Sequence, residues 1–390
     1  MIIRRPLLVF LTASMAGALA WELYKPNRLG RESGLPMGSG NLAWDVGWWL
    51  APLSALAIGV LADRIRRRTL LVAGNLVGAG LLGLLAVSWW QDLITLPQVF
   101  AVTLAISLLA DVSCVGEEAL LPTLVSRRRL VLANTLLYVS VAVVGVAEEL
   151  LDGLPIPFLL LAGALAYVIA ARGFARSEEE PPAPALGVGR SLVDGFRFAA
   201  RHRVVRALTL SLMATTFFGS FVNSVEAASA IGSFAPYETV KALWLGQLGG
   251  VIGVLLVVPL ATRYGAFTTA WVSLLVTLPL GMLLPLVLLT VSSAGLVTQF
   301  MVAFAQSAGL AISSIALLSL RQEVTPSHLL GRAAAVVYAA TSLAAIASDA
   351  LCDALGPEQM LWVGMFGLPL AVLPLLAVRR HFGAGVVLSS

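Results

Sequence analysis

Nine carboxylates lie inside or at the edges of long apolar runs in this 390-residue chain. A charge in apolar surroundings costs several kcal/mol unless it is paired, so an acid kept there is either bonded to a partner or used. Reversible protonation is the chemistry that a lone carboxyl supports best. The nine acids are Glu22, Asp45, Asp111, Glu117, Glu118, Glu148, Glu149, Glu226 and Asp349.

The composition places these acids in a membrane protein. The chain is 59% hydrophobic and 12% charged, with a mean hydropathy of +0.92, which leaves too little polar surface to cover a soluble globule of this size. The net charge of +4 does not indicate nucleic-acid binding, because the basic residues lie in short loops beside apolar runs. The two cysteines, Cys114 and Cys352, lie inside such runs and support neither a disulfide framework nor a metal cluster.

Twelve apolar runs have about the 17 to 25 residues that cross a ~30 Å hydrocarbon core. They cover residues 4–24, 41–61, 69–90, 97–117, 131–151, 157–175, 206–226, 242–262, 268–291, 296–319, 333–352 and 359–378. An all-α membrane protein with twelve transmembrane helices is therefore the predicted fold class.

The arginines and lysines predict the orientation of these helices. If the amino terminus is cytoplasmic, only four of the 25 basic residues fall outside, and the other 21 fall inside. The four are Lys25, Arg28, Arg31 and Lys241. This asymmetry predicts that both termini are cytoplasmic. An alternative is that Arg4, Arg5 and the first apolar run form a cleavable signal peptide, which would leave eleven helices.

A charged segment divides the chain near its midpoint. Residues 177–184 are acidic and rich in proline, which predicts a solvated, extended linker. Apolar residues then recur at helical spacing over 192–200, which predicts a short helix on the inner membrane surface. We therefore expect an N-terminal six-helix bundle over 1–175, a linker over 176–205 and a C-terminal six-helix bundle over 206–390.

The depth of each acid in its run selects the candidates for proton coupling. Asp111 lies nearest the middle of a run, whereas Glu117 and Glu118 lie at its inner end. We expect the protonation site among Glu22, Asp45, Asp111, Glu148 and Glu149, and we favour Asp111 and Glu148. The alternative for the outer acids is that they are interfacial residues reached by water.

Polar and aromatic residues within the runs predict a cavity lining. Gln299, Gln306 and Ser313 repeat every seven residues, and this stripe should face protein or water rather than lipid. The candidate substrate contacts are Trp48, Tyr138, Phe218, Asn223, Gln306 and Tyr338. Packing residues or an interfacial aromatic belt are the alternatives.

The loop at 59–68, with sequence GVLADRIRRR, has the form of a family motif, and Leu260-Ala261-Thr262-Arg263 echoes it in the second half. This loop resembles the motif between helices two and three of the major facilitator superfamily. The stretches 119–134, 194–197 and 321–332 narrow the resemblance to a branch of bacterial exporters that includes siderophore and macrolide efflux proteins.

The resemblance implies two pseudo-symmetric six-helix bundles around a cavity that opens alternately to either side. It also implies a cytoplasmic latch, in which Asp63 faces Gly331 and Arg332, and Arg64 or Arg67 meets Glu117 or Glu118. Gly59 would let another helix approach. The alternative is that the arginines hold topology and touch anionic lipid.

Two departures from this family pattern bear on function. Exporters of the superfamily commonly carry a glycine- and proline-rich motif in helix five, and here only Gly145 of Gly145–Leu150 fits that motif. The first outer loop, 25–40, is longer and more charged than the branch pattern. It is interpreted as a plain insertion or as a segment that binds a partner or shapes the outer mouth.

The sequence does not support an enzyme or an ATP-driven pump. His202, His328 and His381 have no metal-ligand spacing partner, and no phosphate-binding glycine loop occurs. We expect no cofactor and no metal. The leading hypothesis is a monomeric, proton-coupled exporter of amphipathic small molecules in the inner membrane of a bacterium. The alternatives are a lipid or lysolipid flippase, and a non-transporting membrane scaffold or receptor.

Overall fold

The computed structural model describes residues 5–32, 34, 39–151, 153–177, 179, 188–230, 241–242, 245–283, 293–352 and 354–379. Within these ranges every regular element is helical. The chain divides into two compact units. Unit 1 comprises residues 1–196 and 325–339, and unit 2 comprises residues 197–324 and 340–390. Two helices, α8 (Val188–Arg201) and α15 (Leu330–Cys352), therefore run from one unit into the other.

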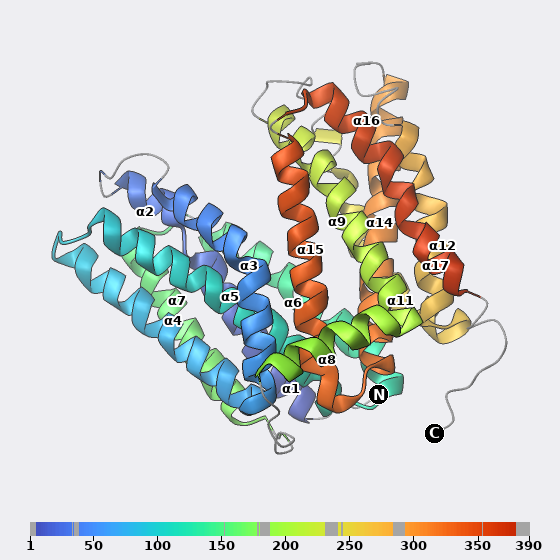
Figure 1. The fold of residues 1–390 in the computed structure, drawn as a ribbon. Coiled ribbons are helices and arrows are strands. Elements are labelled where there is room, and N and C mark those ends of the chain that lie inside the picture. Colours follow the sequence, from blue (N-terminus) through green and yellow to red (C-terminus); the bar gives the residue numbers. More distant parts are fainter. Residues whose placement is uncertain are drawn as a thin grey trace. The chain divides into compact units, whose positions relative to one another are not determined.

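Unit 1 is built mainly from the helices of the first half of the chain (Figure 1). They are α1 (Arg5–Leu23), α2 (Pro26–Glu32), α3 (Ser39–Arg64), α4 (Arg67–Trp90), α5 (Leu96–Leu124), η1 (Arg127–Arg129), α6 (Leu130–Leu151) and α7 (Ile156–Ala175). Helix α1 packs on α6 and α7, α4 packs on α5 and α7, and α3 packs on α5. The 3₁₀ turn η3 (Ser327–Leu329) and the start of α15 complete the unit.

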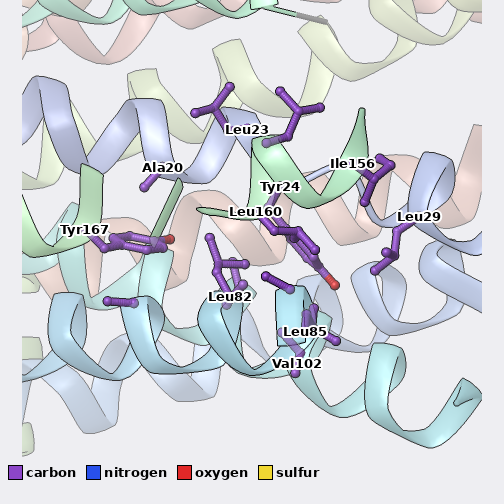
Figure 2. Packing of buried hydrophobic residues seen from close by; sticks show 14 of the residues in the cluster. Ala20, Leu23, Tyr24, Leu29, Leu82, Leu85, Val102, Ile156, Leu160 and Tyr167 are labelled. Atoms are coloured by element: carbon purple, nitrogen blue, oxygen red, sulfur yellow. The ribbon is translucent and has the colours of Figure 1, made fainter. Parts of the chain in front are cut away.

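Tyr24, Leu82 and Leu160 belong to one apolar cluster of unit 1, in which side chains of α1, α2, α4, α5 and α7 meet (Figure 2). Helix α1 contributes Ala20 and Leu23 to this cluster, and both are at most 2% exposed. The first apolar run is thus built into the core of the unit, as expected of a retained span rather than of a signal peptide.

Helix α2 lies in the loop that was interpreted as a plain insertion or a partner-binding segment. Pro26 begins the helix, where its missing N–H costs nothing. Leu29 is 1% exposed and joins the same cluster as Tyr24. The first part of this loop therefore packs on α3 and α5.

Unit 2 contains the later helices. They are α9 (Arg203–Ala230), α11 (Leu248–Tyr264), α12 (Ala266–Thr277), η2 (Pro279–Leu283), α14 (Ser293–Val324), α16 (Pro357–Gly367), η4 (Leu368–Val372) and α17 (Leu373–Val378). Helix α14 packs on α11 and α12, and α9 packs on α16.

Two spans of unit 2 that were predicted as continuous are interrupted by 3₁₀ turns. The run 268–291 changes to η2 after Thr277, and the run 359–378 changes to η4 after Gly367. Each turn begins at or next to a proline, Pro279 or Pro369, which cannot donate the backbone hydrogen bond of an α-helix. Near the second break, the Ser211 hydroxyl donates to the Ala371 carbonyl oxygen at 2.7 Å.

Each of the twelve predicted apolar runs corresponds to an apolar helix in the described part of the chain. Eleven of them are long and apolar enough to cross a membrane, and a shorter apolar helix, Leu248–Tyr264, corresponds to the run 242–262. The apolar side chains that these helices expose would face lipid.

Candidate functional site

The acid that the sequence places deepest lies at the centre of a hydroxyl cluster in unit 1. Asp111 is near the midpoint of α5 and is 5% exposed. The Ser54 hydroxyl of α3 donates to Asp111 Oδ2. The Tyr338 hydroxyl of α15 donates to Asp111 Oδ1 at 2.8 Å. The structure thus joins a predicted protonation site to a predicted cavity residue.

Small residues bring α3 close enough to α5 for this bond. Gly47 lies so near α5 that a Cβ there would be 2.1 Å from Ser107 Oγ. Ala51 and Ala55, on the following turns of α3, are also buried. Ser54 is seven residues after Gly47, and Asp111 is four residues after Ser107, so helical periodicity places the two side chains near the same contact line.

Residues 325–339, which we call the docking segment, pack beside the loop motif. A Cβ at Gly59 would lie 2.4 Å from Ala335 Cβ and 3.4 Å from the Gly331 carbonyl oxygen. Gly195 of α8 makes a similar approach, because a Cβ there would lie 3.0 Å from Arg332 Cβ. These glycines border a small cavity that is also lined by Leu56, Val60 and Val336.

Arg67 connects three parts of unit 1 from a buried position. Its Nη1 donates to the Ala119 carbonyl oxygen of α5 at 3.0 Å, and its Nη2 donates to the Ser327 carbonyl oxygen of η3 at 3.0 Å. The backbone N–H groups of Arg67 and Arg68 donate to the two carboxylate oxygens of Glu179 at 3.0 and 2.9 Å. Glu179 therefore satisfies backbone donors in the first turn of α4, where Arg66 offers no side-chain cap.

These contacts correct the interpretation of the linker. Residues 177–184 are predicted to be solvated, and of these the structure describes Ser177 and Glu179. Ser177 is 1% exposed and Glu179 caps α4, so the prediction is wrong at these two positions. Ser177 also accepts a hydrogen bond from Arg68 Nη1 through its carbonyl oxygen, at 3.2 Å. The cause is the first turn of α4, whose unpaired N–H groups attract a carboxylate.

The other residues that were predicted to form the cytoplasmic latch lie on α3 and α5. Arg64 is exposed at the end of α3, and Glu118 lies on α5 one residue after Glu117. Glu117 accepts a hydrogen bond from the Ser14 hydroxyl of α1. The side chain of Asp63 lies outside the described part of the chain. The latch as the family resemblance implies it stays a prediction.

The other candidates for proton coupling lie near the C-terminal ends of α1 and α6 and near the start of α3. Lys25 forms an ion pair with Glu148, whose side chain is 18% exposed. Glu22 is partly exposed, and Glu148 and Lys25 are the charges that act on it. Asp45 is exposed, and the side chain of Glu149 lies outside the described residues. Because Lys25 compensates its charge, Glu148 is a weaker candidate than Asp111.

The predicted cavity residues are divided between the two units, with Trp48, Tyr138 and Tyr338 in unit 1 and Phe218, Asn223 and Gln306 in unit 2. Trp48 and Tyr138 are 43% and 38% exposed. Phe218 packs against Gly367, and the side chain of Asn223 lies outside the described residues. Gln306 is 7% exposed, and its Nε2 donates to Met365 Sδ at 3.9 Å.

The expectation about the polar stripe of α14 is confirmed. Gln299, Gln306 and Ser313 are all buried in unit 2, at 0%, 7% and 3% exposure. They face protein, as the seven-residue spacing predicts.

Sequence reasoning missed three residues of this site. Ser54 is a single hydroxyl in an apolar run, and only its distance from the end of the span could have drawn attention to it. Ser327 acts through its backbone, which carries no side-chain signal. Glu179 lies in a tract whose composition indicates a solvated linker.

Comparison with known proteins agrees with this architecture. A family model described as Major Facilitator Superfamily matches residues 7–348. A solved structure of a bacterial homologue of the iron transporter ferroportin, in an outward-facing state, has a TM-score of 0.77 and 15% sequence identity. The alignment covers 97% of this chain and 100% of that chain. No curated protein sequence matches the chain significantly.

A second solved structure has the same fold. The transporter FucP in the outward conformation has a TM-score of 0.68 and 12% identity, with 96% of this chain and 98% of that chain covered. A further structure describes FucP as an E. coli fucose:proton symporter, with a TM-score of 0.66 and 12% identity over 95% of this chain and 98% of that chain. At these identities the similarity shows the fold alone.

Proposed function

The chain belongs to the Major Facilitator Superfamily, and on this basis we propose that it is a proton-coupled exporter of amphipathic small molecules that works by alternating access. Its family and its structural neighbours are those of secondary transporters and not of enzymes. Its fold is that of a multi-pass membrane protein with twelve transmembrane helices in two pseudo-symmetric bundles. Our proposal concerns three further properties of the transporter, which are its coupling ion, its direction of transport and its class of substrate.

One observation supports proton coupling. Asp111 is buried near the middle of a transmembrane helix and is bonded to two hydroxyl groups, those of Ser54 and Tyr338. A carboxyl held by hydroxyl donors can gain or lose a proton without breaking an ion pair, unlike Glu148, which is paired with Lys25. Ionisable residues inside transmembrane segments commonly mark substrate pathways, ion pathways or proton relays.

The direction and the substrate class rest on the resemblance of the loop motif and three further stretches to bacterial efflux proteins. We propose a location in the bacterial inner membrane with both termini in the cytoplasm, since this orientation places 21 of the 25 basic residues inside. The substrate would be a siderophore, a macrolide-like drug or another secondary metabolite with both apolar and polar faces.

Accumulation measurements in cells test this proposal. Cells with and without the protein are loaded with radiolabelled erythromycin, with a catecholate siderophore or with a fluorescent lysolipid. Lower accumulation of either of the first two in cells with the protein supports the exporter. Movement of the lysolipid alone favours a flippase. No difference for any probe favours a non-transporting scaffold and contradicts the proposal.

A further inference from the structure

Helix α15 is continuous, but its two halves belong to different units. Residues 330–339 pack in unit 1, whereas residues from Ala340 onward belong to unit 2. The first half of α15 packs with residues of α3 and α5, because Ala334, Ala335 and Ala339 share one buried cluster with Ala55 and Val115. The contacts of the docking segment with unit 1 are the place to look for control of this packing.

Three of these contacts contain no group that could respond to a change of pH. Gly59 meets Ala335 and Gly195 meets Arg332 through carbon atoms, and Arg67 donates to a backbone carbonyl oxygen of Ser327. None of these three contacts contains a group that changes its charge between pH 5 and 9.

The bond between Tyr338 and Asp111 is different. It joins the docking segment to α5 through a carboxyl, and Ser54 of α3 donates to the other oxygen of the same carboxyl. When Asp111 is ionised, both of its oxygens accept a hydrogen bond from a hydroxyl group. Hydrogen bonds to an ionised acceptor are about twice as strong as those between neutral groups.

Protonation changes this arrangement directly. A proton on Oδ1 turns that oxygen from an acceptor into a donor, so the Tyr338 hydroxyl must turn its own hydrogen away. A proton on Oδ2 does the same to Ser54 and leaves Tyr338 bonded to a neutral, weaker acceptor. In both cases the hydrogen bond between Tyr338 and Asp111, which holds the docking segment to α5, becomes weaker.

We propose that Ser54, Asp111 and Tyr338 form a proton-controlled clasp, in which ionised Asp111 holds the docking segment against α3 and α5 and protonated Asp111 releases it. Tyr338 is then a coupling residue that acts through Asp111. This inference rests on the proposed role of Asp111 as the protonation site. To that role it adds the docking segment as the part of the chain that protonation of Asp111 releases.

The direction of this effect suits a proton-driven exporter. A proton that reaches Asp111 while the segment is docked weakens the clasp and favours release of the segment. Loss of that proton restores the ionised carboxylate and favours docking again. One cycle therefore carries one proton across this step and needs no other reactant.

Other groups face this cluster and enter the design of the test. Cys114 and Glu118, on α5 one and two turns after Asp111, act electrostatically on Tyr338 together with Asp111. On α3 and α15 the groups that bond Asp111 are the hydroxyls of Ser54 and Tyr338. Cys114 is exposed and would also react with thiol reagents, so the test replaces it.

Cross-linking in lipid nanodiscs measures docking without a substrate or a proton gradient. The reporter pair is Leu56→Cys and Val336→Cys, which line the same small cavity, in a chain whose two native cysteines are replaced by serine. Cross-linking by a short bis-thiosulfonate is measured between pH 4.5 and 9, and its rate is divided by the rate at which the same reagent modifies the two single-cysteine variants, because the fraction of reactive thiolate itself falls with the pH. We expect this normalised rate to fall as the pH is lowered.

The variants give the decisive comparison. Tyr338→Phe should lower the docked-to-undocked ratio at high pH by roughly 10- to 100-fold, as expected for loss of a hydrogen bond to a charged group, and should flatten the pH dependence. Asp111→Asn should also flatten it, and Tyr338→Phe should cost less in that background.

One further variant serves as a control. Tyr24→Phe removes a hydroxyl that lies 2.7 Å from Thr103 Oγ1, a neutral partner on the same helix α5. It should keep the pH dependence of the parent.

The result that overturns the clasp is a normalised cross-linking rate that does not change with pH, or a Tyr338→Phe variant that docks like its parent throughout. Failure of the proposed function looks different. If erythromycin and siderophore accumulation are unaffected by the protein while docking depends on pH and Tyr338, the clasp stands and the exporter assignment fails. If export requires Asp111 but docking does not depend on pH, the clasp is contradicted and the exporter assignment stands.

Discussion

Substitution of Gly59 by alanine should weaken the docking of residues 325–339 against α3. A Cβ at Gly59 would lie 2.4 Å from Ala335 Cβ, whereas carbon atoms in contact need about 3.5 to 4.0 Å. The helices must therefore separate locally by on the order of 1 Å. Overpacking of this kind costs about 1–3 kcal/mol. The docked-to-undocked ratio should fall by roughly 5- to 150-fold.

The cross-linking rate between Leu56→Cys and Val336→Cys measures this ratio, and two other glycines calibrate it. Gly195→Ala should have a smaller effect, because its Cβ would lie 3.0 Å from Arg332 Cβ. Gly83→Ala should have none, because nothing lies within 4 Å of its Cβ position. A Gly59→Ala variant that cross-links like its parent, or a Gly83→Ala variant that is equally impaired, would refute the packing argument.

Three further predictions concern the linker, the first loop and the start of α9. Glu179→Ala leaves the first turn of α4 uncapped and should lower the free energy of unfolding by about 1 kcal/mol, as measured by thermal unfolding. Glu179→Asp keeps a carboxylate and should retain part of the stabilisation that the cap provides. Leu29→Ala removes a side chain that is 1% exposed and should cost about 2–5 kcal/mol, unlike Leu53→Ala, whose side chain is 65% exposed; equal losses would contradict the packing of α2. Burial lowers the pKa of His202 from its ordinary value of 6.5, so the neutral form is favoured in the fold and stability should fall as the pH drops below about 6.5. His202→Gln should remove this part of the acid sensitivity, and an unchanged pH profile of unfolding would show that it does not arise there.

The spans of this protein are predictable from the sequence because each is a long apolar run whose length matches the bilayer. The interruptions at Pro279 and Pro369 were missed, because a proline inside an apolar run marks either a kink or a break, and packing decides between them. The short helix α2 was missed because its sequence is charged. Leu29 ties it to the core.

The site was predictable in part, for a similar reason. Asp111 stands out as an acid in the middle of an apolar run, but its partner Tyr338 is 227 residues away. No local pattern connects the two, and their pairing follows only from how α15 packs. Glu179 was assigned to solvent from its composition, whereas its position is set by the unpaired N–H groups at the start of α4.

The most direct test of the account is transport driven by an imposed pH gradient. Inside-out membrane vesicles that contain the protein are given an acidic interior, and uptake of radiolabelled erythromycin is measured for the parent, for Asp111→Asn and for Glu148→Gln. We predict gradient-driven uptake for the parent and for Glu148→Gln, and none for Asp111→Asn. Gradient-driven uptake that survives in Asp111→Asn would contradict the account.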